Sequence, residues 1–164
     1  MEFKEDHLLN EGVLRLMEHF HGRIVSVHRH IEVGEDKLEV DAVVLAKRSH
    51  YRIIGVELKS TDVLKAVQQS VVRRPFFHYF YIVSGEHSAQ RYLGYYIDSL
   101  YRHGKLHLLL EHGVGWIMLD LSGNPWLIYP SRYLRTDKTL KPKVFMNMYL
   151  NKSTVSIKGE PNVL

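Results

Sequence analysis

The sequence contains no cysteine and no long apolar run, and both absences limit what the protein can be. Without cysteine, the 164-residue chain forms no disulfide and offers no thiolate to a metal or to a substrate. No apolar stretch approaches the roughly 18 to 20 residues that a membrane-spanning helix needs. The N-terminal MEFKEDHLL is also too charged for a signal peptide. We therefore expect a cytoplasmic protein.

Two common catalytic motifs are missing as well. The absence of a Gly-rich phosphate loop argues against a nucleotide hydrolase. The absence of G-x-S-x-G, together with the absence of cysteine, argues against the usual acyl-transfer nucleophiles. The composition, 45% hydrophobic and 24% charged, is ordinary for a soluble globular chain that is long enough to bury one core.

The net charge of +4 is unevenly distributed along the chain. Residues 131–164 carry seven Lys or Arg against two acidic residues, whereas residues 1–130 are close to neutral. A basic C-terminal segment is compatible with a polyanionic partner, and equally with a solvated tail that aids solubility.

Hydrophobic periodicity and turn residues predict an α/β fold with a mixed sheet. In chain order we expect a helix over 4–20 ended by Gly22, strands over 23–33, 38–46 and 51–59, a helix capped by Ser60 or Thr61 and ended by Pro75, a strand over 77–83, a helix over 89–103, and short strands over 106–110, 116–121 and 126–129. Three strands joined by four-residue turns indicate an antiparallel meander. The helix after the third strand permits a parallel crossover to the fourth. The last 25 residues show no assignable pattern.

The most informative stretch is YRIIGVELKST, residues 51–61. Glu57 and Lys59 lie two residues apart inside an apolar run, so a strand places both on one face. Asp41 lies inside the apolar run of the preceding strand. Charged residues are rarely placed in buried strands unless they are paired or bind a metal. We therefore expect Asp41, Glu57 and Lys59 to meet at one edge of the sheet.

This arrangement resembles the PD-(D/E)xK nuclease superfamily. Its signature is an aspartate on one strand and (D/E)-x-K on the next, between an N-terminal helix and a second helix; here these residues are Asp41 and Glu57-Leu58-Lys59, with Val40 in place of the consensus proline. The resemblance implies a restriction-endonuclease-like core of order α-β-β-β-α-β over residues 1–130. Residues 131–164 are then a basic C-terminal extension of the same domain.

The resemblance also implies a Mg²⁺-dependent nuclease that hydrolyses DNA, with Mn²⁺ as a substitute. Asp41, Glu57 and the Leu58 carbonyl supply the oxygen ligands that Mg²⁺ prefers. Lys59 is the catalytic lysine, which orients the attacking water and offsets charge in the transition state.

Three assignments depend on helix faces. Gln69, or else Gln68, supports the lysine or a water. An acidic residue of the first helix completes the metal site: Glu5 fits the apolar face of the helix better, and Glu11 fits the family's usual placement. Lys65, Arg73 and Arg74 on the second helix are candidate nucleic-acid contacts, although cations at a helix C-terminus also stabilise the helix.

Other readings of the same residues remain open. Asp41 and Lys59 can form a buried ion pair with Glu57 exposed, or the fold can be a catalytically inactive module that binds nucleic acid or protein. A homodimer is plausible because small members of the family commonly pair to cut two strands. The eleven histidines lack zinc-site spacing and are expected mostly at the surface, with His28 or His78 as possible phosphate contacts.

Overall fold

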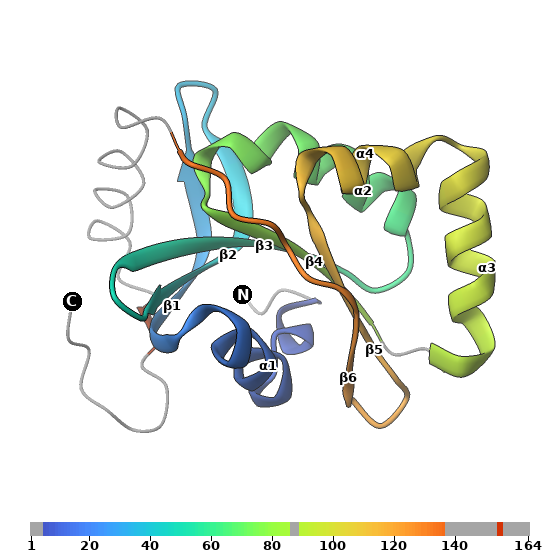
Figure 1. Cartoon of the computed structure of the whole chain (residues 1–164), viewed down its shortest axis with the longest axis horizontal. Coiled ribbons are helices and arrows are strands. Elements are labelled where there is room, and N and C mark those ends of the chain that lie inside the picture. The colour runs from blue at the N-terminus through green and yellow to red at the C-terminus, as the bar shows by residue number, and fades with distance from the viewer. Residues whose placement is uncertain (1–4, 86–88, 137–153, 156–164) are drawn as a thin grey trace.

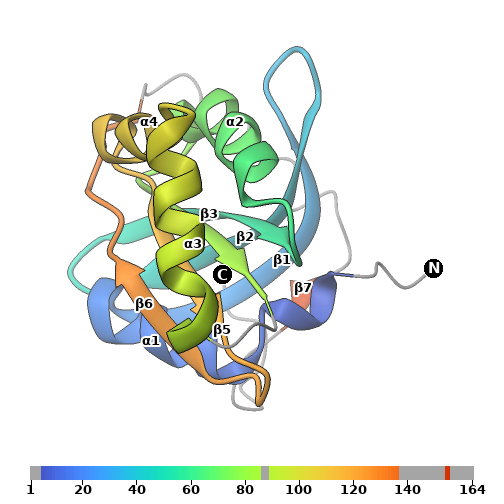
Figure 2. The ribbon, with the colours of Figure 1, turned by 90° about the vertical axis from the view of Figure 1, so that its right-hand side faces the viewer.

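The structure, a computed structural model, describes residues 5–85, 89–136 and 154–155. It is a layered α/β fold in which one mixed sheet lies between helices (Figures 1 and 2). The strands are β1 (Arg23–Val33), β2 (Leu38–Lys47), β3 (Tyr51–Lys59), β4 (Tyr79–Ser84), β5 (Gly115–Leu119), β6 (Pro125–Tyr129) and β7 (Thr154–Val155). The helices are α1 (Glu11–His21), α2 (Val63–Arg73), α3 (Ala89–Arg102) and α4 (Lys105–His112), with short 3-10 turns η1 (Asp6–Leu8) and η2 (Arg74–Phe76). The predicted α/β class is confirmed.

The sheet has the strand order β6-β5-β4-β3-β2-β1-β7. Strands β1, β2 and β3 form the predicted antiparallel meander. Strand β4 pairs parallel to β3 after the α2 crossover, which was also predicted, and β5 pairs parallel to β4. The central strands read as nearly continuous apolar runs because helices cover both of their faces.

Each face of the sheet carries its own apolar cluster. On one face α2, α3 and α4 pack through Val67, Leu100 and Leu109, with Trp116 of β5 fully buried beneath them. On the other face η1 and α1 pack through residues such as Met17. Figure 2 shows α1 and the α2–α4 pair on opposite sides of the sheet. Every residue near the centre of β3 is therefore buried, including polar ones.

The first helix begins later than predicted. It starts at Glu11, because the Asn10 side chain accepts a hydrogen bond from the Val13 N–H (2.9 Å) and caps the helix. The described residues before it form η1 instead. The second helix is likewise capped by Asp62, which accepts from the Lys65 N–H (3.0 Å), and not by Ser60 or Thr61. These shifts decide which acidic side chains reach the sheet.

The predicted strand over 106–110 is wrong, since these residues lie in α4. A short run of leucines does not distinguish a buried strand from a buried helix turn. Gly104 and Gly113, both at positive φ, bound the helix at its two ends. The predicted hairpin of β5 and β6 is confirmed.

Part of the segment after residue 130 packs on this core. Ser131 is buried, and its hydroxyl accepts from the Phe80 N–H and donates to the Gly113 carbonyl. The Leu134 N–H donates to the His78 carbonyl (2.8 Å). Thr154–Val155 adds the edge strand β7 beside β1. In the described part of the chain, no helix is long and apolar enough to cross a membrane.

Gly22 lets the end of α1 approach the turn between β2 and β3. Its φ is 101°, and an added Cβ would lie 2.7 Å from the Lys47 carbonyl oxygen. We expect Gly22→Ala to lower the free energy of unfolding by about 3 kcal/mol, because it adds backbone strain to a clash that backbone atoms cannot relieve. Chemical denaturation measures this loss.

Gly94 provides the matched control. It lies within α3, and a Cβ there would meet no atom within 4 Å. Gly94→Ala should leave stability unchanged or raise it by up to about 1 kcal/mol through helix propensity. Equal effects of the two substitutions would contradict the proposed role of Gly22.

Candidate active site

Asp41 lies where strands β2 and β3 separate. Their paired register ends at Ala42 and Val56, and β3 continues to Lys59 beside β4 alone. Just beyond the last pair, Asp41 Oδ2 accepts a hydrogen bond from the Leu58 N–H at 2.8 Å. The Asp41 carboxylate thus takes the place of the backbone carbonyl that a neighbouring strand would offer to the Leu58 N–H. We call this point, where β2 and β3 diverge, the fork.

A local kink in β1 and β2 explains why Asp41 turns into this fork. Val40 and Val43 of β2 pack in the same apolar cluster, although a regular strand would place residues three apart on opposite faces. Opposite this point, His30 of β1 has a positive φ of 53°, which is uncommon for a non-glycine residue. Asp41 lies at the irregular point of β2, between Val40 and Ala42, where the alternation of side chains between the two faces of the sheet is broken.

Glu57 is the second carboxylate of the fork and is only 4% exposed. Its Oε2 has no hydrogen-bond partner among the described residues. Burial, and then the neighbouring Asp41, raise the pKa of Glu57 to about 8, against the opposing charges of Arg73 and Lys59. Burial also raises the pKa of Asp41, although the hydrogen bond from Leu58 opposes this shift. The pair therefore holds a proton at neutral pH when no cation is bound.

Lys59 lies two residues beyond Glu57 on the same face of β3 and is half-buried. Its charge lowers the pKa of Glu57, so the ammonium group acts on that carboxylate. No described residue forms a hydrogen bond or ion pair with its side chain. The alternative with an Asp41–Lys59 ion pair and an exposed Glu57 is therefore not what the structure shows.

Of the two candidate acidic residues near the N-terminus, the structure brings Glu5 to the fork. Glu5 precedes η1, and its carboxylate accepts a hydrogen bond from the Ser60 N–H. Its charge also raises the pKa of Asp41. Glu11 instead lies in the first turn of α1, is exposed, and pairs with Arg15. The late start of α1 is the reason for this difference.

We expect Glu5→Gln to slow the metal-dependent reaction proposed below by about tenfold or more, as is typical of partners that orient metal-site residues. Glu11→Gln is the matched control, because it removes the same charge from the same segment. It should leave the rate unchanged. Single-turnover cleavage assays measure both, and equal rates for the two variants would remove Glu5 from the site.

On α2, Gln69 is half-buried and its Oε1 has no hydrogen-bond partner among the described residues, whereas Gln68 and Lys65 are exposed. The helix packs on the face of β3 that carries Ile53 and hence Glu57. Between the two glutamines, Gln69 is thus the one turned toward the protein interior. Lys65 remains a solvent-accessible cation.

The two arginines at the end of α2 have different environments. Arg73 lies near the fork, where it lowers the pKa of Glu57, and its Nε donates to the Glu39 carbonyl (2.7 Å). Arg74 is 1% exposed, and its guanidinium donates to carbonyls of Phe77, His78, His112 and Arg132. The prediction that Arg74 contacts nucleic acid is therefore corrected: this arginine is a buried structural residue.

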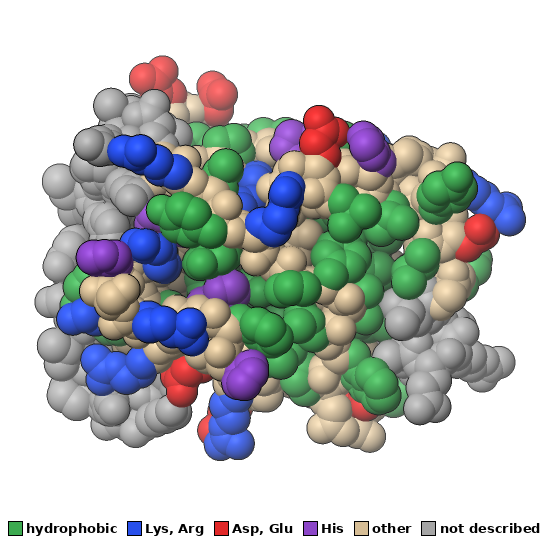
Figure 3. Space-filling model, viewed as in Figure 1, with side chains coloured by type: hydrophobic (Ala, Val, Ile, Leu, Met, Phe, Trp, Pro, Cys, Tyr) green, Lys and Arg blue, Asp and Glu red, His purple; other side chains and the backbone are tan. Residues whose placement is uncertain are grey.

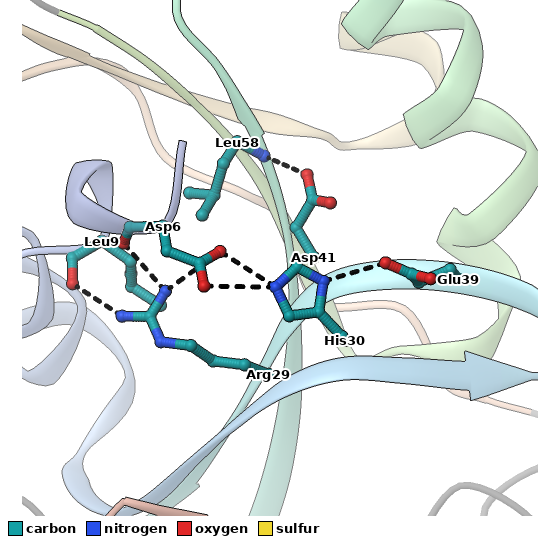
Figure 4. A network of polar contacts seen from close by, with 7 residues as sticks. All are labelled: Asp6, Leu9, Arg29, His30, Glu39, Asp41 and Leu58. Atoms are coloured by element: carbon teal, nitrogen blue, oxygen red, sulfur yellow. Dashed lines mark hydrogen bonds and ion pairs between the residues drawn. The ribbon is translucent and has the colours of Figure 1, made fainter. Parts of the chain in front are cut away.

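Sequence reasoning missed a charged network beside the fork (Figure 4). The His30 ring lies between two carboxylates, with Nδ1 2.8 Å from Glu39 Oε1 and Nε2 3.0 Å from Asp6 Oδ1. Burial disfavours the charged ring, but hydrogen bonds with Glu39 and Asp6 outweigh it and raise the pKa of His30. Ligand atoms of His30, Glu39 and Asp41 all lie within 4.8 Å of one another.

One signal for this network was present in the sequence. Glu39 precedes Asp41 by two residues, the same spacing that singled out Glu57 and Lys59. No local pattern indicates that His30 or Asp6 joins them, because that contact depends on the kink in β1. Three other histidines expected at the surface, His21, His28 and His78, are buried instead.

Buried histidines here have structural partners. His28 is 0% exposed, contacts the Ser26 hydroxyl at 2.9 Å, and has its pKa lowered to about 4 by burial. His78 Nδ1 accepts a hydrogen bond from the Ile53 N–H (2.9 Å). Neither is accessible to a phosphate group. The suggestion that either contacts nucleic acid is therefore wrong.

Comparisons with known proteins show the fold alone. No family model matches the chain, and no curated protein matches it. Among solved structures, the chain is similar to the SPO1766 protein of unknown function from Silicibacter pomeroyi, with a TM-score of 0.57 and 11% sequence identity. The match covers 92% of this chain and 87% of that protein. A similarity over nearly the whole of both chains means that the α/β architecture recurs in a second protein.

Proposed function

We propose that this protein is a metal-dependent nuclease that hydrolyses DNA phosphodiester bonds on a restriction-endonuclease-like core. The observation that carries the proposal is the buried Glu57, whose Oε2 lacks a hydrogen-bond partner in the described structure, beside Asp41 at the fork. A buried carboxylate normally has a partner or binds a cation. Lys59 lies on the same face of β3, two residues beyond Glu57.

The donor set fits a hard divalent cation such as Mg²⁺, with Mn²⁺ as a substitute. Asp41 and Glu57 offer carboxylate oxygens. The N–H and C=O of one residue point to the same side of a strand, so the Leu58 carbonyl lies on the Asp41 side as well. Glu5 is the fourth acidic or carbonyl group in reach of the fork. A bound cation would polarise the phosphoryl oxygen and lower the pKa of a water molecule.

The side chains of the fork have separable roles. Asp41 and Glu57 would lose their shared proton and hold the cation. Lys59 would orient the attacking water and offset the negative charge that develops on phosphorus. Gln69 would position Lys59 or a water molecule from α2. Arg73, close to Glu57, and the exposed Lys65 would contact the DNA backbone.

A panel of DNA substrates tests the proposal: supercoiled plasmid, linear duplex, single strand and a four-way junction, each with Mg²⁺, Mn²⁺ or EDTA. We expect cleavage that requires the metal and a clear preference within the panel. A protein that binds the panel without cutting it under any condition is a nucleic-acid-binding module. A protein that neither binds nor cuts contradicts the nucleic-acid assignment altogether.

A further inference from the structure

A second cavity lies at the other end of β3 from the carboxylates. It has a volume of about 160 Å³ between the end of α1 and the turn from β2 to β3, and it is lined by Phe20, His21, Arg48, Ser49, His50, Arg52 and Tyr79. Arg52 and Glu57 are five residues apart on one strand, which is about 17 Å. Figure 3 shows Lys, Arg and His side chains gathered over this end of the molecule. The cavity is therefore separate from the fork.

Among the residues that the structure describes, the lining of this cavity is basic and contains no acidic residue. Arg48 donates one hydrogen bond to the His19 carbonyl (3.4 Å), and Arg52 donates one to the Tyr51 carbonyl (3.0 Å). A guanidinium has five N–H donors, so each arginine retains several. Neither forms an ion pair with an acidic residue of the described segments. Two such guanidinium groups around one cavity favour an oxyanion.

His21 also lines the cavity, and it has a buried polar atom without a partner in the described structure. The ring is 7% exposed, and its Nε2 contacts the Tyr81 hydroxyl at 2.6 Å. Its Nδ1 has no hydrogen-bond partner within the described residues. Burial, and then the charge of Arg48, lower the pKa of His21 to about 4, so the ring is neutral. If the Tyr81 hydroxyl donates to Nε2, then Nδ1 carries the proton and is a donor.

Aromatic rings flank the basic groups. The centroid of the Tyr79 ring lies 3.9 Å from that of His21, and the exposed Phe20 also lines the cavity. Tyr133, 49% exposed, lies 5.1 Å from the Arg52 guanidinium. Basic groups beside exposed rings are typical of surfaces that bind single nucleic-acid strands. A volume of about 160 Å³ is large enough to hold a phosphate group.

We propose that this cavity is an oxyanion site that binds a phosphate group of a nucleic-acid strand through Arg48, Arg52 and His21. The oxyanion site itself rests only on the cavity, whereas its assignment to a nucleic acid rests on the proposed function. The phosphate has two possible sources, an internal backbone phosphodiester or a terminal phosphate. In both cases the site holds the strand at the opposite end of β3 from the carboxylates, about 17 Å away along β3.

The test compares Arg48→Gln and Arg52→Gln with Arg102→Gln, which removes an exposed guanidinium of α3 outside the cavity. Binding of a fluorescent 12-nucleotide single strand, with a 5′-phosphate or a 5′-hydroxyl, is measured in EDTA over a salt series. We expect each cavity variant to weaken binding about tenfold and to reduce the salt slope by about one. Arg102→Gln should bind as the wild type does.

The two oligonucleotides distinguish the sources. Equal losses for both assign the site to internal phosphates, and a loss confined to the 5′-phosphorylated strand assigns it to a terminal phosphate. A loss no larger than that of Arg102→Gln overturns the proposal. Thermal unfolding of each variant is recorded as well, and a loss of binding that only accompanies unfolding counts against the site.

A second measurement uses the unaltered protein, with ¹⁵N-labelled histidine and inorganic phosphate as the probe. We expect the His21 ring to show a protonated Nδ1 whose resonance shifts on titration, while that of His28 does not. An unchanged His21 resonance together with unchanged oligonucleotide binding refutes the oxyanion site. If oligonucleotide binding depends on Arg48 but no condition gives cleavage, the site stands and the nuclease proposal fails.

Discussion

Asp41→Asn and Lys59→Met should each lower the rate of metal-dependent DNA cleavage by at least about 100-fold, but for different reasons. Asp41 holds the cation in the proposed site, so its neutral amide weakens metal binding as well as catalysis. In the proposed mechanism Lys59 acts on the water and on the transition state, so methionine, with a similar length and no charge, should remove the chemical step alone. The two variants therefore distinguish the loss of metal binding from the loss of the chemical step.

Mg²⁺ or Mn²⁺ titration by calorimetry, beside single-turnover cleavage, makes this separation measurable. Lys59→Met should retain metal affinity, and Asp41→Asn should lose it. Glu111→Gln is the control, because that exposed residue of α4 pairs with His107 away from the fork. If Asp41→Asn binds metal and cuts DNA as the wild type does, the fork is not the catalytic centre.

Glu57→Gln should make the metal-free protein more stable at pH 8 than the wild type, by a few kcal/mol. The pKa of Glu57 is about 8 in the folded protein and near 4.5 when unfolded. Between these values the folded state retains a proton that the unfolded state releases, so wild-type stability falls as pH rises. Below about pH 4.5 both states are protonated and this difference vanishes. Glutamine carries no titrating group and avoids the loss.

Denaturant unfolding at pH 4, 6 and 8 in EDTA measures this trend, and the difference between variant and wild type isolates Glu57 from other titrating groups. Saturating Mg²⁺ should then stabilise the wild type, since a ligand that binds only the folded state adds to its stability, and should have little effect on Glu57→Gln. If the stability of the wild type changes between pH 4 and pH 8 in the same way as that of Glu57→Gln, then Glu57 is not a buried, protonated carboxyl group.

Local patterns predicted much of the sheet and its central residues. The strands over 23–33 and 51–59 have the predicted bounds, because a run of β-branched residues between turn signals is a local property. Short turns then force antiparallel pairing, which brings Asp41 beside the end of the third strand. The antiparallel pairing of the second and third strands was therefore enough to predict that Asp41 and Glu57 lie close together.

Where a helix begins and which of its side chains are buried could be seen only in the tertiary structure. Asn10 begins α1, and it also donates to the Gly123 carbonyl (2.9 Å), a contact 113 positions along the chain. This contact helps to place Glu5 rather than Glu11 at the fork. Likewise Arg73 and Arg74 are indistinguishable by charge, and only the carbonyls around Arg74 show that it is structural.

By itself, the sequence determined an α/β sheet with Asp41, Glu57 and Lys59 at the end of two neighbouring strands, because periodicity and turn length act over a few residues. The tertiary structure alone decided three things: the choice of Glu5, the clamp of His30 between Asp6 and Glu39, and the basic cavity formed where α1 ends against the β2–β3 turn. Each depends on surfaces that come from separate elements. Burial and the mutual approach of charges arise only when those elements pack, and no local pattern records them.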